Sequence, residues 1–133
     1  MDDELKQKTR KTAELYFKDV PDERPYALWR AFDRELAREF SLFITGRLYA
    51  REKLDHKTRQ LITISALTVL SRTDELRLHI QAALNVGCRP EEISETIFQT
   101  FTYAGIPTVN SALKILKGVL VQKGLWPLES SGK

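Results

Sequence analysis

The chain has 133 residues, of which 42% are apolar and 29% charged, and its formal net charge is +3. This length fits one globular domain, and the apolar content is too high for an intrinsically disordered chain. A single cysteine excludes an internal disulfide framework, and no cluster of Cys and His residues indicates a zinc site. We therefore expect one domain over 1–133, with no bound metal and a short disordered tail at 129–133.

Charge patterning bears on the partners that the chain could bind. The apolar stretches are interrupted by charge well before the roughly 18 residues that a membrane span needs, and the acidic start MDDE differs from the basic start of a signal peptide. Basic residues alternate with acids, as around Arg34 and Arg38, whereas nucleic-acid binders gather them into a patch. These features predict a cytoplasmic protein with no membrane or nucleic-acid partner, and a small anionic substrate stays open.

The N-terminal half, residues 5–50, has helical spacing throughout. Residues 5–18 have the pattern of a short charged helix. Pro25 suits the first turn of a second helix, because its missing N–H costs nothing there. Gly46 is expected to bend or end that helix. Apolar residues recur along it every three or four positions and predict one stripe for the core or for a subunit contact: Trp29, Phe32, Leu36, Phe40 and Phe43.

The C-terminal half predicts four more helices. Asp55 is the expected N-cap of an apolar helix, which we place centrally because it is apolar on several sides. The remaining helices are expected over 73–86, 90–104 and 107–123. Gly87, after the first of these three, fits a left-handed C-terminal cap. Since no alternating strand pattern is present, the sequence predicts an all-α fold of about six helices.

Two histidines are the candidate proton-transfer groups. His56 lies at an expected helix start, which favours a solvated surface role. His79 follows Glu75 by four residues, so the two side chains share one helix face. A carboxylate beside an imidazole raises the imidazole pKa and fixes its tautomer. From spacing alone, an ordinary surface pair remains the simpler interpretation.

Other polar residues could complete a site around the Glu–His pair. Guanidinium groups match carboxylates in bidentate geometry, and three arginines lie nearby in the sequence: Arg72, Arg59 and Arg77. With the Glu–His pair they could form an anion-binding, proton-transferring pocket, to which Tyr103 could add a hydroxyl donor. Cys88 has no neighbouring cysteine, and the sequence shows no base that would make it a nucleophile.

Several segments, in this order, resemble the carboxymuconolactone decarboxylase family. They are LDHKTRQL at 54–61, ELRLH at 75–79, ALNVG at 83–87, EEI at 91–93 and YAGIP at 103–107, followed by Asn110. The resemblance implies an alkylhydroperoxidase-D-like bundle built around helical hairpins, with a family core at about 40–120. It also implies a homo-oligomer, either a trimer or a hexamer.

The resemblance leaves the reaction open between two branches of the family. The peroxidase branch carries Cys-x-x-Cys-x-x-x-His, and Arg72 and Glu75 occupy the two cysteine positions here. The acid upstream in that branch's proton relay aligns with Gln60. A thiol-disulfide cycle cannot run on these side chains, so the sequence argues against thiol peroxidase activity.

The decarboxylase branch is cofactor-free and converts 4-carboxymuconolactone into the 3-oxoadipate enol-lactone and CO2 in aromatic-acid breakdown. Its Glu-x-x-x-His pattern is present here. The resemblance therefore implies that His79 donates the proton and Glu75 orients it, and charge complementarity suggests that the arginines bind a small anionic lactone or keto acid. A lactone or keto-acid isomerase, a hydrolase and a non-catalytic oligomeric member remain alternatives.

Overall fold

The computed structural model describes residues 2–128, and every regular element in that range is helical. The elements are α1 (Asp2–Phe17), α2 (Pro25–Phe32), α3 (Arg34–Ser41), the π-helical segment η1 (Leu42–Tyr49), α4 (His56–Val69), α5 (Thr73–Asn85), α6 (Pro90–Gln99), α7 (Phe101–Ala104) and α8 (Ile106–Gln122). The predicted all-α fold is confirmed. The tail expected at 129–133 lies outside the described residues.

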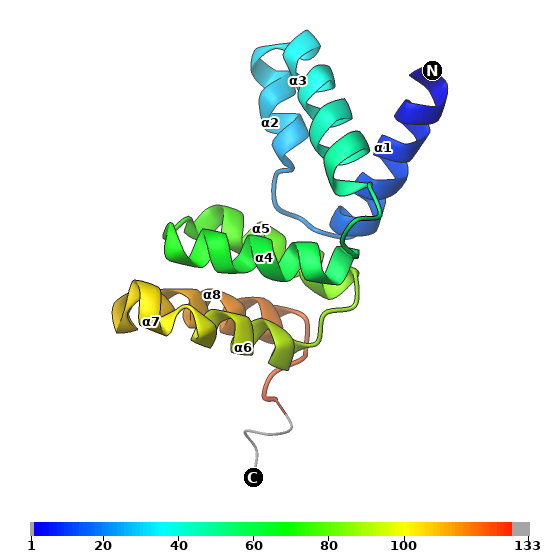
Figure 1. The fold of residues 1–133 in the computed structure, drawn as a ribbon. Coiled ribbons are helices and arrows are strands. Elements are labelled where there is room, and N and C mark those ends of the chain that lie inside the picture. Colours follow the sequence, from blue (N-terminus) through cyan, green and yellow to red (C-terminus); the bar gives the residue numbers. More distant parts are fainter. Residues whose placement is uncertain (1, 129–133) are drawn as a thin grey trace.

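The helices form two groups (Figure 1). The α4–α5 pair lies against α6, α7 and α8 in a bundle, and α1 to α3 project from the opposite side of that pair. The first helix packs against both η1 and α5, which joins the N-terminal group to the bundle. No helix among residues 2–128 is both long and apolar enough to cross a membrane.

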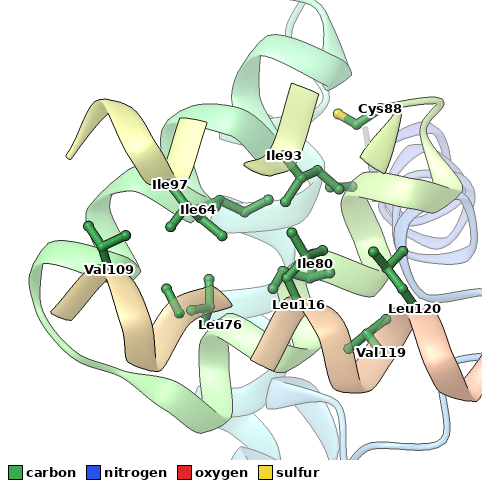
Figure 2. Close-up of a cluster of buried hydrophobic side chains, with 12 residues drawn as sticks. Ile64, Leu76, Ile80, Cys88, Ile93, Ile97, Val109, Leu116, Val119 and Leu120 are labelled. Atoms are coloured by element: carbon green, nitrogen blue, oxygen red, sulfur yellow. The ribbon is translucent and has the colours of Figure 1, made fainter. Parts of the chain in front are cut away.

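Aliphatic side chains from four helices make the core of the bundle (Figure 2). Residues three or four positions apart meet there from α4, α5, α6 and α8, as helical spacing requires. The fully buried members include Ile64, Ile80, Ile93, Ile97, Val119 and Leu120. Burying one such side chain contributes roughly 1.5–3 kcal/mol. The core therefore holds together the helices that support the site.

Several local signals in the sequence act as expected. Asp55 caps α4, because its Oδ1 accepts a hydrogen bond from the Thr58 N–H at 2.7 Å. Pro25 and Pro90 begin α2 and α6. Gly87 follows α5 with a φ of +98°, in the left-handed region that glycine adopts readily. These contacts involve neighbours in the chain, so the sequence could predict them.

The helix expected to carry the aromatic stripe is broken in two. Asp33 has an extended backbone, and its Oδ1 accepts a hydrogen bond from the Leu36 N–H at 3.0 Å. Because this residue ends α2 and caps α3, the stripe does not continue along one helix. Phe32 is 87% exposed, so of the two roles predicted for the stripe, core or subunit contact, the core is excluded for this residue.

Two further expectations differ from the structure. Gly46 does not itself end a helix, because η1 continues three residues further to Tyr49: it is buried inside η1, where α1 approaches so closely that an added Cβ would meet Thr9 Oγ1. The apolar helix that Asp55 begins, α4, is not covered on most of its sides, because Ile62 and Val69 are exposed. One face of α4 packs on the bundle and the other is open in a single chain.

Candidate active site

A cavity of about 990 Å³ opens between the N-terminal helices and α5. Helices α1 and α2 and segment η1 supply a largely apolar and aromatic wall that includes Tyr16, Phe17, Tyr26, Trp29, Leu42 and Tyr49. His79 is the residue of α5 that lines the cavity. Apolar walls lower the local dielectric, which strengthens the interaction of a bound charge with nearby groups. The cavity therefore has the features of a small-molecule site.

The imidazole of His79 is held from behind by a buried amide. Its Nδ1 lies 3.0 Å from Oε1 of Gln60, a fully buried residue of α4. An amide oxygen only accepts, so Nδ1 carries the hydrogen and donates it. The ring also packs edge-on against Phe17, with 6.1 Å between ring centroids. No described residue bonds Nε2, which leaves that nitrogen for a ligand.

Burial lowers the pKa of His79 from 6.5 to about 4, because the charged ring would lose its water. The charge of Glu75 acts in the opposite direction but is outweighed. The expected rise of the pKa is therefore wrong in sign, since Glu75 is itself exposed and Gln60 is the partner of Nδ1. His79 is therefore neutral at pH 7.

A second histidine lies behind the same wall. The Tyr16 hydroxyl and His56 Nδ1 are 2.5 Å apart, and their rings meet edge-on. Burial raises the pKa of Tyr16 to about 12, although the neighbouring Gln60 amide and the Arg59 charge partly offset this rise. The expected solvated role of His56 is therefore wrong, because its ring is half-buried and bonded to Tyr16.

The predicted arginines are not gathered at the cavity. Arg77 Nε binds Asp22 Oδ2 at 3.1 Å and its Nη2 donates to Gln122 Oε1 at 2.6 Å, so this side chain ties a loop to the end of α8. Arg59 Nη2 donates to the Arg51 carbonyl at 2.9 Å. Neither lines the cavity, and both side chains are engaged in contacts elsewhere in the fold.

Two other predicted residues are exposed. Arg72 precedes α5 and makes no side-chain capping hydrogen bond. Tyr103, on α7, is 79% exposed. Neither lines the cavity, so among the predicted site residues only His79 reaches it in this chain.

Basic residues from the N-terminal helices surround the cavity instead. They are Lys6, Arg10, Lys11, Arg24 and Arg38, with Glu14 as the one acid among the lining residues. Arg24 is half-buried: its Nη2 donates to the Phe17 carbonyl at 2.9 Å, and its guanidinium carbon lies 5.8 Å from the Phe17 ring centroid. No motif in the sequence marks these residues, because they line one cavity with His79 only once the N-terminal segments pack together and against α5.

Cys88 stays outside this chemistry. It is buried at the edge of the core, where its Sγ lies 3.6 Å from the Lys57 carbonyl. Burial raises the pKa of the thiol to about 11, which keeps it protonated at neutral pH. Among the described residues, no group of three His, Cys, Asp or Glu side chains could hold a metal ion.

Comparison with known proteins finds a family match that covers most of the chain after α2. The model of the Carboxymuconolactone decarboxylase family matches residues 34–118. Over 96 residues the chain is 35% identical to the 4-carboxymuconolactone decarboxylase of Acinetobacter baylyi, covering 72% of each chain. The matched range includes His79 and Gln60, whereas Tyr16 on α1 and Arg24, the residue before α2, lie N-terminal to it.

Two further relatives align with this chain over somewhat shorter stretches, of 80 and 82 residues. The chain is 41% identical over 80 residues to an uncharacterized 15.0 kDa protein in the nqo9-nqo10 intergenic region of Paracoccus denitrificans, covering 59% of this chain and 60% of the relative. It is 30% identical over 82 residues to the nitrosuccinic acid decarboxylase of Metarhizium robertsii, covering 59% of this chain and 57% of the relative. Two of the three relatives are thus named as decarboxylases.

Proposed function

The chain belongs to the carboxymuconolactone decarboxylase family, and from this premise we propose that it is a cofactor-free decarboxylase of a small anionic lactone or keto acid. The observation that carries the proposal is a neutral imidazole, His79, at the wall of a cavity whose charged groups are mainly basic. 4-Carboxymuconolactone is the first substrate to test, because the Acinetobacter relative is named for it.

Arg24 is the proposed anion anchor of this cavity. One of its N–H groups is bonded to the Phe17 carbonyl, which holds the guanidinium beside the ring that contacts His79. Its other N–H groups have no partner among the described residues, so they are available to a carboxylate. In an apolar cavity such a charge-assisted pair is stronger than in water. The anchor would place the substrate between α1 and α5.

The reaction requires a proton on carbon after CO2 has left. Loss of CO2 leaves an electron pair delocalised onto the carbonyl oxygen, where a nearby guanidinium would stabilise the enolate. A bound carboxylate favours the imidazolium form of His79, which opposes the effect of burial. His79 would thus take a proton from solvent as the anion binds and transfer it from Nε2 to carbon. A carboxylate and one proton become a C–H bond and CO2.

A steady-state assay of CO2 release from 4-carboxymuconolactone and a panel of keto acids tests this proposal. We expect His79→Gln to lower kcat on the order of 10²- to 10⁴-fold, the usual size of a general acid–base contribution. Arg24→Met should raise KM. The matched control is Lys114→Met, which removes an exposed positive charge from α8 and should leave KM unchanged. A wild-type chain that releases no CO2 from any of these compounds, or an unimpaired His79→Gln variant, contradicts the proposal.

We also propose that the chain is a homo-oligomer, a trimer or hexamer. Soluble monomers seldom expose large contiguous apolar patches, yet two groups of apolar residues are exposed here: Leu28, Phe32, Leu36, Phe40 and Phe43 on α2, α3 and η1, and Ile62, Leu70, Phe98 and Phe101 on or beside α4, α6 and α7. Sedimentation equilibrium should give a multiple of 15.3 kDa, which Phe32→Glu should reduce. A wild-type monomer contradicts this proposal.

A further inference from the structure

We propose that Tyr16 and His56 are positioning residues, which act through Gln60 to hold His79 in the tautomer with its hydrogen on Nδ1. The inference deepens the proposed function, and its catalytic meaning rests on that function. It concerns the only two histidines of the chain, His56 on α4 and His79 on α5, each of which is hydrogen-bonded to a buried polar side chain.

The direction of the network begins at Gln60. Its Oε1 accepts from His79 Nδ1 at 3.0 Å, so its Nε2 points away from the histidine. That nitrogen is buried and has no hydrogen-bond partner of ordinary length among the described residues. The neighbouring polar group is the Tyr16 hydroxyl, whose pKa the Gln60 amide lowers. An amide NH2 only donates, and donation toward the phenol oxygen lowers the pKa of a phenol in this way.

Tyr16 passes this direction on to His56. Since the oxygen of Tyr16 faces a donor on the Gln60 side, its own hydrogen is directed to His56 Nδ1 at 2.5 Å. Tyr16 is 1% exposed, and its ring is fixed edge-on between those of Tyr49 and His56. The hydroxyl therefore cannot turn to solvent for another hydrogen-bond partner. His56 accepts at Nδ1 and carries its hydrogen on Nε2.

The four groups form a chain with two hydrogen bonds of ordinary length, and the proposal adds the third link, from the otherwise unpartnered Gln60 Nε2 to the Tyr16 oxygen. It runs from His79 Nδ1–H to Gln60, from Gln60 Nε2–H toward the Tyr16 oxygen, and from the Tyr16 hydroxyl to His56. Reversing one link would reverse them all, because the amide would have to turn and His79 Nδ1 would have to accept. The tautomers of the two histidines are thus coupled.

The coupling matters for the face that His79 presents to the cavity. With its hydrogen on Nδ1, the ring offers an unprotonated Nε2, which can take up the proton that arrives with an anionic substrate. The opposite tautomer would offer an N–H group and could not accept a proton at Nε2. Tyr16 lies on α1, before the region matched by the family model. The N-terminal helix therefore sets the protonation pattern of a residue on α5.

Long-range ¹H–¹⁵N correlation spectra of uniformly ¹⁵N-labelled protein at pH 7 test the inference without substrate. We expect wild-type His79 to show a protonated Nδ1 and an unprotonated Nε2. Tyr16→Phe removes the hydroxyl and keeps the ring, so it should introduce the second tautomer of His79. His56→Ala, at the first residue of α4, should act in the same direction and replaces Tyr16→Phe if that variant does not fold.

Tyr103→Phe is the matched control. It removes an exposed hydroxyl from a residue that is not part of the network, so the His79 spectrum should stay unchanged. A wild-type His79 with its hydrogen on Nε2, or a single Nδ1–H tautomer that persists in the folded Tyr16→Phe variant, overturns the inference. Coupled tautomers in a protein that decarboxylates nothing would overturn only the proposed function. Active wild-type enzyme with uncoupled tautomers would overturn only the positioning role.

Discussion

Lowering the pH from 7 to 5 should destabilise the wild-type chain by about 2 kcal/mol more than it destabilises a His79→Gln variant. The pKa of His79 is about 4 in the folded chain and 6.5 as its ordinary value. Above pH 6.5 the ring is neutral in both states, so it has no effect on stability. Between pH 6.5 and 4 only the unfolded chain binds the proton, and the free energy of unfolding falls as the pH is lowered. Below pH 4 the loss levels off near 3 kcal/mol, or about 1.36 kcal/mol for each unit of pKa difference.

Urea unfolding followed by circular dichroism at pH 7, 6 and 5 measures this difference. Both variants are compared at one protomer concentration, because assembly makes apparent stability concentration-dependent. Gln at position 79 stays polar but does not titrate, and the acids titrate in both variants, so only the difference in pH dependence is read. Parallel pH dependences would mean that His79 is not held neutral by burial, and the proton uptake that we propose would lose its basis.

Three other changes test separate parts of the structure. Gln60→Glu should raise the pKa of His79, because it places a buried carboxylate at its Nδ1, and an NMR titration would show a shift to higher pH, whereas an unchanged midpoint would contradict the contact. Gly46→Ala should lower the free energy of unfolding in urea by about 1–3 kcal/mol, because the new methyl group meets α1. Gly118→Ala, on the open side of α8, should not lower it, and equal effects of the two substitutions would refute this packing. Cys88 should resist alkylation at pH 8 in the folded chain and react once urea unfolds it, since its pKa is raised to about 11; fast labelling of native protein would show that the thiol is accessible.

Contacts between near neighbours in the chain were accessible to sequence reasoning. The Asp55 cap, the left-handed Gly87 and the prolines that begin helices depend on groups within one or two turns. Apolar spacing in the C-terminal half predicts the core for the same reason, since an α-helix repeats its faces every three or four residues. The break at Asp33 is also local, but the apolar spacing continues across it and hides it.

By itself, the sequence determined the helical class, the family, His79 as the residue to examine and the helix boundaries of the bundle, except that the helix expected over 90–104 is divided into α6 and α7 at Thr100. These features rest on short-range geometry or on an ordered set of motifs. The tertiary structure decided the rest. Arg24 and Tyr16 reach the neighbourhood of His79 only through the packing of α1, and the sign of the His79 pKa shift follows from the burial that this packing creates. A carboxylate four residues away is visible in a sequence, whereas loss of water depends on every segment that covers the ring.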